Sequence, residues 1–426
     1  MTPSQKPSAT GSVWTRRQWL AAAATGLAAA GCDKLPKLAD FSLLRHTMKV
    51  KGEIHVLIWD NYISQAIFDG FLAETGIKVT PHIFSSNDAL ADLLRKRAAP
   101  YDLVMPSSFE GARLREVGLL KTFKAADLPN LAEMDGLTFN PKFDPKNQYL
   151  VPYIWGATGI GYNARRVNGL PKSWADLFAY QLRPDGTNVG VSVLDDARFT
   201  LGTVLIYLKK SPNTASVADI EQAGEVLMKL RKNITYFESD NVAKLLADNS
   251  VDLAMAWTGD VTRAMMGDRD DNIPANRAVR ISLPREGAII FRDCFAVPQA
   301  AENQEEAEMF VNYLLNPKVA AQVTNYSLYA TTVPRSRPLV DRFVLNGPSF
   351  FEHPEGAKNN FTLDDVIASD DVYQRVWAQV KSAPPVQIDP LTIPGAPAPA
   401  TGTANPAMPV PTNPPPSVLL RAPSMG

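Results

Sequence analysis

The chain has 426 residues, which is too long for one small hydrophobic core and suits two α/β lobes with appendages. Its formal net charge of -1 provides no overall basic field, so the composition argues against nucleic acid as a partner. The 2 cysteines form no disulfide framework and the 4 scattered histidines lack the spacing of a metal site, so we expect no cofactor and no metal.

The N-terminus has the pattern of an export signal, predicted to cover residues 1–32. Arg16 and Arg17 precede an apolar run, residues 20–31, that is too short to cross a bilayer as a stable helix. The arginine pair resembles a twin-arginine signal, which exports folded proteins. We therefore expect the mature protein in the periplasm.

The end of the apolar run predicts a lipid anchor. The sequence Ala29-Ala30-Gly31-Cys32 resembles a bacterial lipobox, in which Cys32 would become the lipidated first residue. Ala29 stands where that pattern prefers leucine, so simple cleavage after Ala30 is the alternative. Asp33 resembles an inner-membrane retention signal, and residues 33–51 are predicted to be a tether.

Strands and helices alternate from residue 53 to residue 118. Residues 53–59 (EIHVLIW), 77–84 and 101–106 (YDLVMP) have the composition of strands, and helices are predicted after each. This alternation predicts a parallel, doubly wound sheet, in which ligands bind beyond the carboxyl ends of the strands. The residues that follow the three strands are Trp59, Asp60, Asn61 and Tyr62, then Ser85, Ser86 and Asn87, then Ser107, Ser108 and Phe109.

A glycine-rich strand is predicted at residues 151–163 (VPYIWGATGIGYN). Glycine inside a strand weakens it and often marks a bend or the close approach of backbone or ligand. The stretch also separates a loop rich in Pro, Asn and Asp from a new run of helices and strands. We interpret it as a strand that crosses between two lobes; a buried strand of one large domain is the alternative.

The second half repeats the alternation. Strands are predicted at residues 190–194 (GVSVL) and 251–257 (VDLAMAW), and residues 288–298 are a second candidate crossing segment. From Ala383 onward the chain is rich in Pro, Ala and Thr, nearly uncharged and without periodicity, so a disordered tail is predicted. A long helix that bears Leu201, Val204, Leu205 and Leu208 is predicted after Asp195 and Asp196, and further helices at residues 173–180, 216–230, 305–315, 318–326 and 371–382.

Aromatic and acidic residues gather at the predicted strand ends. Carboxylates neutralise ammonium groups, and ring faces attract cations while packing on methylene groups, so the combination suits a cationic ligand. Taken singly, an Asp after a strand is more often a helix cap and a Trp more often core. The aromatic residues are Trp59, Tyr62, Phe109, Trp257 and Tyr329, and the acids are Asp60, Asp196, Asp260 and Asp293.

Residues 53–382 resemble the periplasmic polyamine-binding proteins of ABC transporters, and most of all the putrescine-binding branch. The resemblance implies a two-lobed periplasmic binding protein fold, type II-like, with parallel-type sheets and two crossing segments at a hinge. The motifs that carry it are residues 59–62 (WDNY), 101–107 (YDLVMPS), 152–163 (PYIWGATGIGYN), 257–261 (WTGDV), 281–288 (ISLPREGA) and 312–317 (NYLLNP).

The resemblance also implies a division of the chain. The first lobe is expected to comprise residues 52–154 and 294–335, and the second lobe residues 155–293 and 336–383. Residues 384–426 form the predicted tail.

The same resemblance implies roles for individual residues. Trp59 and Trp257 match aromatic walls against the carbon chain of the ligand, and Asp260 and Asp293 match carboxylates that hold ammonium groups. Tyr62 and Tyr329 match aromatic contacts, and Ser107 and Ser239 match polar ones. The remaining members of the predicted site are Asp60, Asn61, Phe109, Asp196, Phe199 and Phe291.

Two of these positions depart from the family. Asn61 stands where the family has an acid between Trp and Tyr, and Phe199 stands where it has a Glu. A buried ammonium group without a partner costs several kcal/mol, so the departures leave the ligand open. Putrescine, spermidine, another diamine and a monoamine with an apolar end all remain candidates.

The expected function is capture of a polyamine-like cation by a monomer and its delivery to an ABC permease in the inner membrane. The same fold tuned to another amine or a zwitterion, or presenting its ligand to a sensory receptor, is an alternative. A hydrolase using Asp195 and Asp196, or Asp260 and Asp293, is a different class of alternative, although no nucleophile motif accompanies either pair. Ferric-ion binding by Tyr326 and Tyr329 is a further one.

Overall fold

The computed structural model describes residues 52–96, 100–134, 141, 143–178, 183, 186–187, 189–347, 359–364 and 369–383. The predicted signal with Cys32, the whole of the tether and the tail lie outside these residues. The elements described below belong to one compact unit, which begins at Glu53. Within the described ranges, every helix is too short or too polar to span a membrane.

The first lobe contains the predicted parallel sheet, in the strand order β2-β1-β3. Helix α3 ends, as predicted, at Gly76, whose φ of 72° is the left-handed conformation that glycine adopts without strain. The third strand is only two residues long, shorter than predicted. The elements are β1 (Glu53–Trp59), α3 (Gln65–Thr75), β2 (Lys78–Phe84), α4 (Asn87–Lys96), β3 (Leu103–Val104), α5 (Ser108–Glu116), β4 (Leu120–Lys121), η1 (Ala125–Asp127), η2 (Pro129–Glu133) and η3 (Pro145–Asn147).

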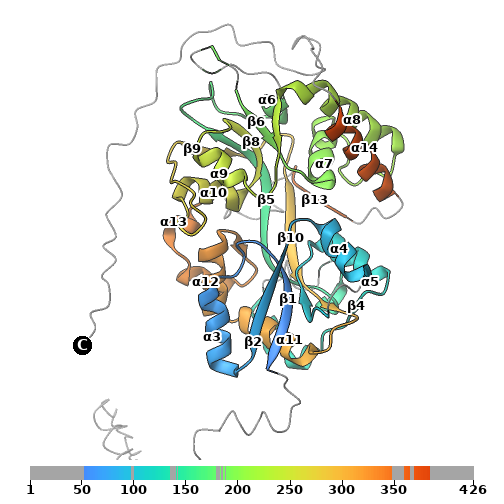
Figure 1. Cartoon of the computed structure of the whole chain (residues 1–426), viewed down its shortest axis with the longest axis vertical. Coiled ribbons are helices and arrows are strands. Elements are labelled where there is room, and N and C mark those ends of the chain that lie inside the picture. The colour runs from blue at the N-terminus through green and yellow to red at the C-terminus, as the bar shows by residue number, and fades with distance from the viewer. Residues whose placement is uncertain are drawn as a thin grey trace, which may run out of the picture. The chain divides into compact units, whose positions relative to one another are not determined.

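Two long strands run through both lobes, which confirms the predicted crossing segments (Figure 1). All 13 residues of β5 (Val151–Asn163) are buried. Its first half pairs antiparallel with β10 (Ile289–Phe295), and its second half pairs with β8 (Leu253–Trp257) and β9 (Val279–Ser282). Close approach explains a glycine here: a Cβ on Gly156 would lie 2.7 Å from the Phe291 ring.

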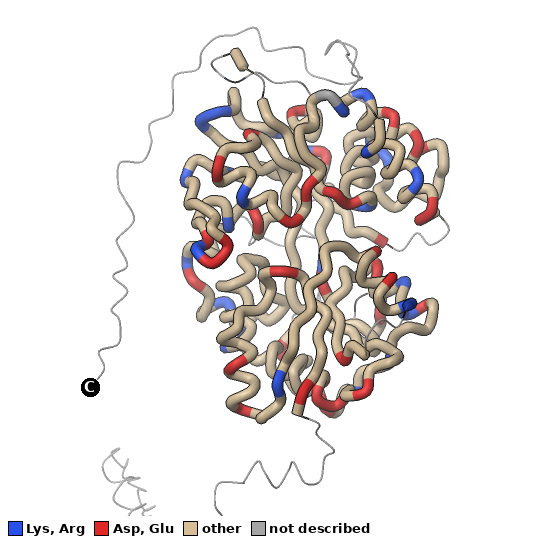
Figure 2. Tube along the Cα trace, in the orientation of Figure 1, with Lys and Arg blue, Asp and Glu red and all other residues tan. Residues whose placement is uncertain are grey.

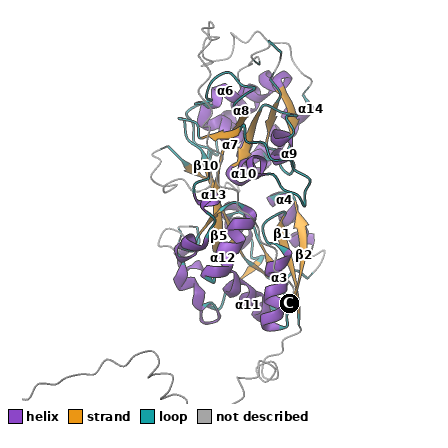
Figure 3. Cartoon of the chain, turned by 90° about the vertical axis from the view of Figure 1, so that its left-hand side faces the viewer, coloured by secondary structure: helices purple, strands orange, loops and turns teal. Residues whose placement is uncertain are grey.

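The second lobe is built on the strand order β13-β10-β5-β8-β6-β7, and helices flank the strands (Figure 3). Sequence patterns did not reveal β7, β9, α9 or α10, because these elements are too short for a periodic pattern to stand out. The remaining elements are α6 (Trp174–Phe178), β6 (Val191–Val193), α7 (Ala197–Tyr207), α8 (Val217–Leu230), η4 (Arg231–Asn233), β7 (Ile234–Phe237), α9 (Val242–Ala247), α10 (Thr258–Met266), β13 (Phe361–Thr362) and α14 (Asp370–Ser382).

After β10 the chain returns to the first lobe, where α11 contacts β1 and α12 contacts α3. Residues 336–383 were expected in the second lobe, and within that range the part up to residue 345 departs from the expectation. Instead η5 packs against α12, and Val340 and Val344 join a cluster with Ala321 and Leu328 of the α12 region. The elements of this return are β11 (Val297–Pro298), α11 (Gln304–Leu314), α12 (Pro317–Ser327), β12 (Ala330–Thr331), η5 (Pro334–Leu339) and α13 (Arg342–Leu345).

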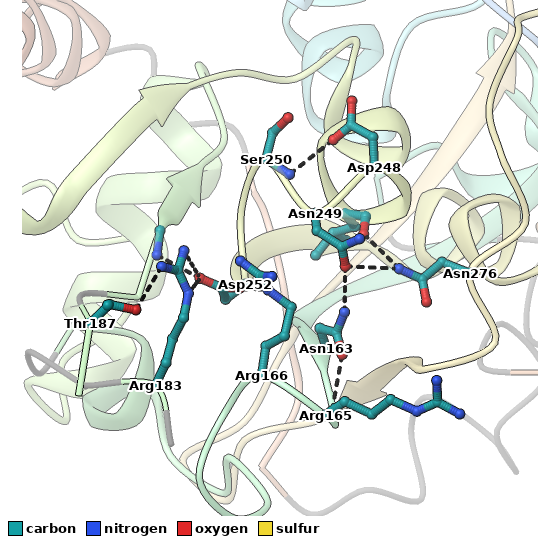
Figure 4. Close-up of polar contacts among 12 residues, drawn as sticks. Asn163, Arg165, Arg166, Arg183, Thr187, Asp248, Asn249, Ser250, Asp252 and Asn276 are labelled. Carbon is teal, nitrogen blue, oxygen red and sulfur yellow. Dashed lines mark hydrogen bonds and ion pairs between the residues drawn. The ribbon is translucent and has the colours of Figure 1, made fainter. Parts of the chain in front are cut away.

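A buried carboxylate ties together the chain segments at the outer end of the second lobe (Figure 4). Asp252, immediately before β8, is fully buried. It accepts hydrogen bonds from Arg183 Nε at 3.0 Å and from the backbone N–H of Gly190 at 2.9 Å, and it also pairs with Arg166. Asp252 therefore joins the chain after β5 to the loop that precedes β6.

We expect Asp252→Asn to lower the free energy of unfolding by about 3 kcal/mol, because it removes the charge that both guanidinium groups face. The estimate is at the low end for a buried pair because the Arg166 side chain is 35% exposed and can be hydrated. Urea denaturation measures the change. Asp248→Asn, in the exposed turn nearby, is the control; equal losses in the two variants would contradict the prediction.

Candidate functional site

The cleft between the lobes contains a cavity of about 260 Å³. Every predicted ligand-binding residue except Phe109 lines it, and acidic segments lie on both lobes where they face each other (Figure 2). The first lobe supplies residues at the ends of β1, β2 and β3, and the second lobe supplies residues after β6, β7 and β8. The lining residues are Trp59, Asp60, Asn61, Tyr62, Phe84, Ser85, Asn87, Ser107, Asp196, Phe199, Ser239, Asp240, Asn241, Ala243, Lys244, Trp257, Asp260, Arg263, Asp271, Ile273, Phe291, Asp293 and Tyr329.

Asp293 is the most completely enclosed carboxylate of the cleft, at 2% exposure. It lies on β10, one residue before a break in the register of that strand with β5. Tyr62 Oη donates to Asp293 Oδ2 at 2.6 Å, and Ser107 Oγ donates to Oδ1 at 2.7 Å. Burial raises the pKa of Asp293 to about 6, against the two hydrogen bonds, which lower it. Tyr62 and Ser107 thus hold the Asp293 carboxylate in place, and neither of them brings a positive charge to it.

Asp293 is held in place by an amide network that begins at α4. The Asn87 side chain accepts a hydrogen bond from the Ser107 N–H at 3.0 Å and donates to Ser107 Oγ at 3.2 Å. The Ser107 hydroxyl therefore has a fixed orientation toward Asp293. The antiparallel bridge between Ser107 and Asp293 joins the end of the first-lobe sheet to the crossing strand.

A second carboxylate, Asp260, enters the cleft from the first turn of α10. Tyr329 Oη lies 3.5 Å from Asp260 Oδ1 and donates to it. Burial raises the pKa of Asp260 to about 7, and the charge of Arg263 opposes that rise. A cation in the cleft would favour the ionised form of both Asp260 and Asp293.

Aromatic rings form a continuous lining between the acids. Tyr62 and Tyr329 meet edge to face at a centroid distance of 5.6 Å, and Tyr329 and Phe291 do so at 5.4 Å. Phe291 continues to Phe199 at 6.4 Å, and Phe199 to Trp257 at 5.8 Å. Such a lining gives apolar surface to methylene groups and negative ring faces to a cation.

The two positions that depart from the family both lie in this cavity. Asn61 has a φ of 57°, and its N–H and side-chain amide donate to Asp60 at 2.9 and 3.2 Å. Asn61 thereby orients the neighbouring acid at the exposed edge of the cleft. Phe199 is 3% exposed and presents only its ring.

Asp196 lies beside Phe199 and has two roles in the structure. As expected from the sequence, it caps α7, accepting a hydrogen bond from the Phe199 N–H at 2.9 Å. It also lines the cavity, and burial raises its pKa to about 6. Asp195, by contrast, lies outside the cavity, where it accepts from Trp377 Nε1 at 3.1 Å and Lys381 Nζ at 2.8 Å.

The strand-end candidates Ser86 and Ser108 do not line the main cavity, and neither does Phe109 of the predicted site. Phe109 lines a smaller neighbouring cavity with Arg198, whose guanidinium lies 5.5 Å from the ring. Phe109 lies on α5, whereas Ser107, two residues earlier, occupies the strand end that faces the main cavity. Sequence reasoning missed lining residues that follow β7 and α10, namely Asp240, Asn241, Lys244, Asp271 and Ile273, because neither element was recognised.

The site does not favour metal binding or nucleophilic catalysis. Among the described residues there is no group of three or more His, Cys, Asp or Glu that could hold a metal ion. Burial raises the pKa of Tyr326, and raises that of Tyr329 well above its ordinary value, which disfavours the phenolates that ferric iron requires. Cys294 is a buried free thiol whose pKa burial likewise raises, so a nucleophilic role is disfavoured.

Comparisons with known proteins agree with this geometry. Residues 66–344 match the family described as bacterial extracellular solute-binding protein. The putrescine-binding periplasmic protein PotF of Escherichia coli (strain K12) is 35% identical, with 77% of this chain and 91% of PotF covered. The spermidine/putrescine-binding periplasmic protein of the same organism is 33% identical, with 76% and 90% covered.

A solved structure shows the same architecture. The putative spermidine/putrescine ABC transporter from Listeria monocytogenes superposes with a TM-score of 0.70 at 25% identity. The match covers 78% of this chain and 99% of the Listeria chain.

Proposed function

Because this chain belongs to the bacterial extracellular solute-binding proteins, we propose that it captures a polyamine of the putrescine or spermidine type in the periplasm and delivers it to an ABC permease. The relatives named above bind these amines, and the cleft has the matching chemistry. Closure of two lobes on a ligand shifts the equilibrium between open and closed forms by the difference in affinity of those forms.

The observation that carries the proposal is the environment of Asp293. Its carboxylate receives two hydrogen bonds from neutral hydroxyl groups, those of Tyr62 and Ser107. An ammonium group would neutralise it and donate further hydrogen bonds, which are stronger than bonds between neutral groups. The rings of Tyr62, Tyr329 and Phe291 then leave space for a carbon chain between carboxylates.

The departures at Asn61 and Phe199 are compatible with a diamine. Asp196 supplies a carboxylate next to Phe199, and Asp60 supplies one next to Asn61. We infer that these neighbouring acids replace the two missing ones, so that a second ammonium group has a partner. A monoamine with an apolar end would instead use the Phe199 ring alone.

Isothermal titration of the full-length chain, stripped of ligand, tests the proposal. Putrescine, spermidine and butylamine are compared at pH 7.5 (the buffer is free of amines). Tight one-to-one binding of putrescine or spermidine, with butylamine much weaker, is the expected result. Binding of butylamine as tight as that of putrescine would contradict the role of Asp196 and Asp60. No heat with either polyamine would overturn the proposed function.

Polyamine affinity is expected to rise with pH between about 5 and 8. Asp293 and Asp260 have pKa values of about 6 and about 7 in the free protein, and each must lose its proton before it can pair with an ammonium group. Ionisation of Asp293 alone predicts an affinity about 10-fold lower at pH 5 than at pH 7. Titration across this range measures the slope, and a flat profile would contradict the prediction.

Ligand-free stability should change in the opposite direction with pH. A folded-state pKa of about 6 for Asp293 exceeds its ordinary value of 3.8, so the folded protein binds more protons than the unfolded chain between these values. The free energy of unfolding therefore falls as pH rises through this window, and added polyamine restores it.

The N-terminal signal supports a further part of the proposal. We infer export through the twin-arginine route and anchoring at Cys32, with the protein acting as a monomer beside its permease in the inner membrane. Metabolic labelling with a radioactive fatty acid tests the anchor. We expect the label in the wild type and no label in Cys32→Ala. An unlabelled protein whose first residue is Gly31 would indicate simple cleavage after Ala30.

A further inference from the structure

The two lobes touch on one side through polar residues that lie outside the ligand cavity. Helix α14 belongs to the second lobe, where it packs on α7 and α8. At its first turn Asp370 Oδ2 lies 2.6 Å from Arg113 Nη1 on α5 of the first lobe. One turn later, Gln374 Nε2 donates to Asp88 Oδ2 on α4 at 2.8 Å. Figure 1 shows α14 and the pair α4 and α5 on the same side of their respective lobes.

Arg113 has a second acidic partner that does not depend on the other lobe. Glu110, three residues earlier on α5, places Oε2 3.2 Å from Arg113 Nε. Glu110 is 1% exposed, so this pair stays with the first lobe when the lobes separate. A guanidinium that lost its only buried partner would oppose separation strongly. Glu110 remains beside Arg113 when the contact with Asp370 breaks, but burial raises the pKa of Glu110 to about 8, so at neutral pH its carboxyl is mostly protonated and does not replace the charge of Asp370.

One member of these contacts, Asp88, is adjacent in sequence to the ligand site. Asp88 follows Asn87, whose side chain orients Ser107 toward Asp293. Asn87 and Asp196 also line both the main cavity and the smaller cavity beside Arg113. Closure that brings Asp196 toward a ligand at Asp293 therefore also brings α14 toward α4 and α5.

We propose that the pairs Arg113–Asp370 and Asp88–Gln374 form a latch that sets how long the closed protein retains its ligand. This inference rests on the proposed function only in taking a polyamine as the ligand. Contacts made in the closed form alone stabilise that form, so their loss speeds release while leaving the encounter with the open form unchanged. Arg113, Asp370, Asp88 and Gln374 are thus positioning residues that never touch the ligand.

Stopped-flow tryptophan fluorescence with putrescine and spermidine tests the latch in the full-length chain. Asp370→Asn removes the charge that faces Arg113, and Gln374→Glu places a like charge against Asp88. We expect each variant to increase the dissociation rate constant about 10-fold and to change the association rate constant less than 2-fold. A dissociation rate equal to that of the wild type in both variants would overturn the proposal.

Arg375→Gln is the matched control on the same helix. Arg375 Nη2 pairs with Glu221 of α8 at 3.1 Å, within the second lobe, so its loss removes a charge from α14 without touching the latch. The control should keep wild-type rates. An equal rise in its dissociation rate would show that any damage to α14 accelerates release, and this too would overturn the latch.

A measurement without ligand separates this inference from the proposed function. Fluorophores on Cys residues placed at Lys78 and Glu225, on the outer surfaces of the first and second lobes, report the distance between lobes. We expect Gln374→Glu to lower the fraction of closed molecules in the ligand-free protein, whichever ligand binds. If the distribution of distances between the lobes were unchanged, the latch would be overturned even with polyamine binding established. A failure of polyamine binding alone would leave the effect of Gln374→Glu on that distribution intact.

Discussion

Replacement of Asp293 by Asn is expected to weaken putrescine binding by about 10²- to 10³-fold, corresponding to roughly 3–4 kcal/mol. The amide keeps the shape of the side chain but offers no negative charge to the ammonium group. The hydroxyls of Tyr62 and Ser107 lie 2.6 and 2.7 Å from the carboxylate, so the site cannot move another acid into its place. Isothermal titration at pH 7.5 measures the loss.

Two further measurements identify the cause of that loss. Asp195→Asn removes the carboxylate immediately before Asp196, the cap of α7. Because Asp195 pairs with Lys381 outside the cavity, this variant should bind polyamine normally. Thermal unfolding of Asp293→Asn at pH 8 should show a ligand-free protein at least as stable as the wild type, since burial disfavours the ionised carboxyl. Wild-type affinity in Asp293→Asn would exclude Asp293 as the ammonium partner.

Trp257→Ala is expected to reduce polyamine affinity by about 2–4 kcal/mol, or roughly 30- to 10³-fold. Trp257 ends β8 and meets the Phe199 ring at 5.8 Å and the Phe291 ring at 6.4 Å. Its removal opens the apolar side of the cavity to water and takes a ring face from the ligand. Titration with putrescine and spermidine measures the effect, which should be present for both.

Tyr236→Ala is a suitable control for this change. Tyr236 is an aromatic residue of the same lobe that is 42% exposed and does not line the cavity. Its removal should leave affinity unchanged. A Trp257→Ala variant that binds both amines like the wild type would show that Trp257 belongs to the core and has no part in recognition.

The fold was predictable where residue patterns are strong. The apolar strand at residues 53–59 and the glycines of residues 151–163 correctly indicated a parallel sheet and a strand that crosses between lobes. The acid Asp293 could be placed at the crossing because it lies inside the second candidate crossing segment, residues 288–298. Close packing explains why these patterns are informative: Gly156 leaves no space for a side chain against Phe291.

Local sequence patterns do not predict which of the remaining residues come together in the cleft. Asp240 follows β7, whose burial alternates too weakly to mark a strand, and Asp271 lies in a loop beyond the unrecognised α10. The exclusion of Phe109 depends on the direction in which α5 leaves the sheet. Likewise Asp370 meets Arg113 across 257 residues of sequence, a contact that only tertiary packing creates.

The shared strand β5 has a consequence for how the protein folds and how it could be divided. Its first half pairs with β10 and its second half pairs with β8 and β9, all within one sheet. Neither half of the molecule therefore possesses a full set of backbone partners when expressed alone. The protein should melt in a single cooperative transition, and fragments cut between the lobes should expose unpaired strand edges and aggregate unless they are recombined.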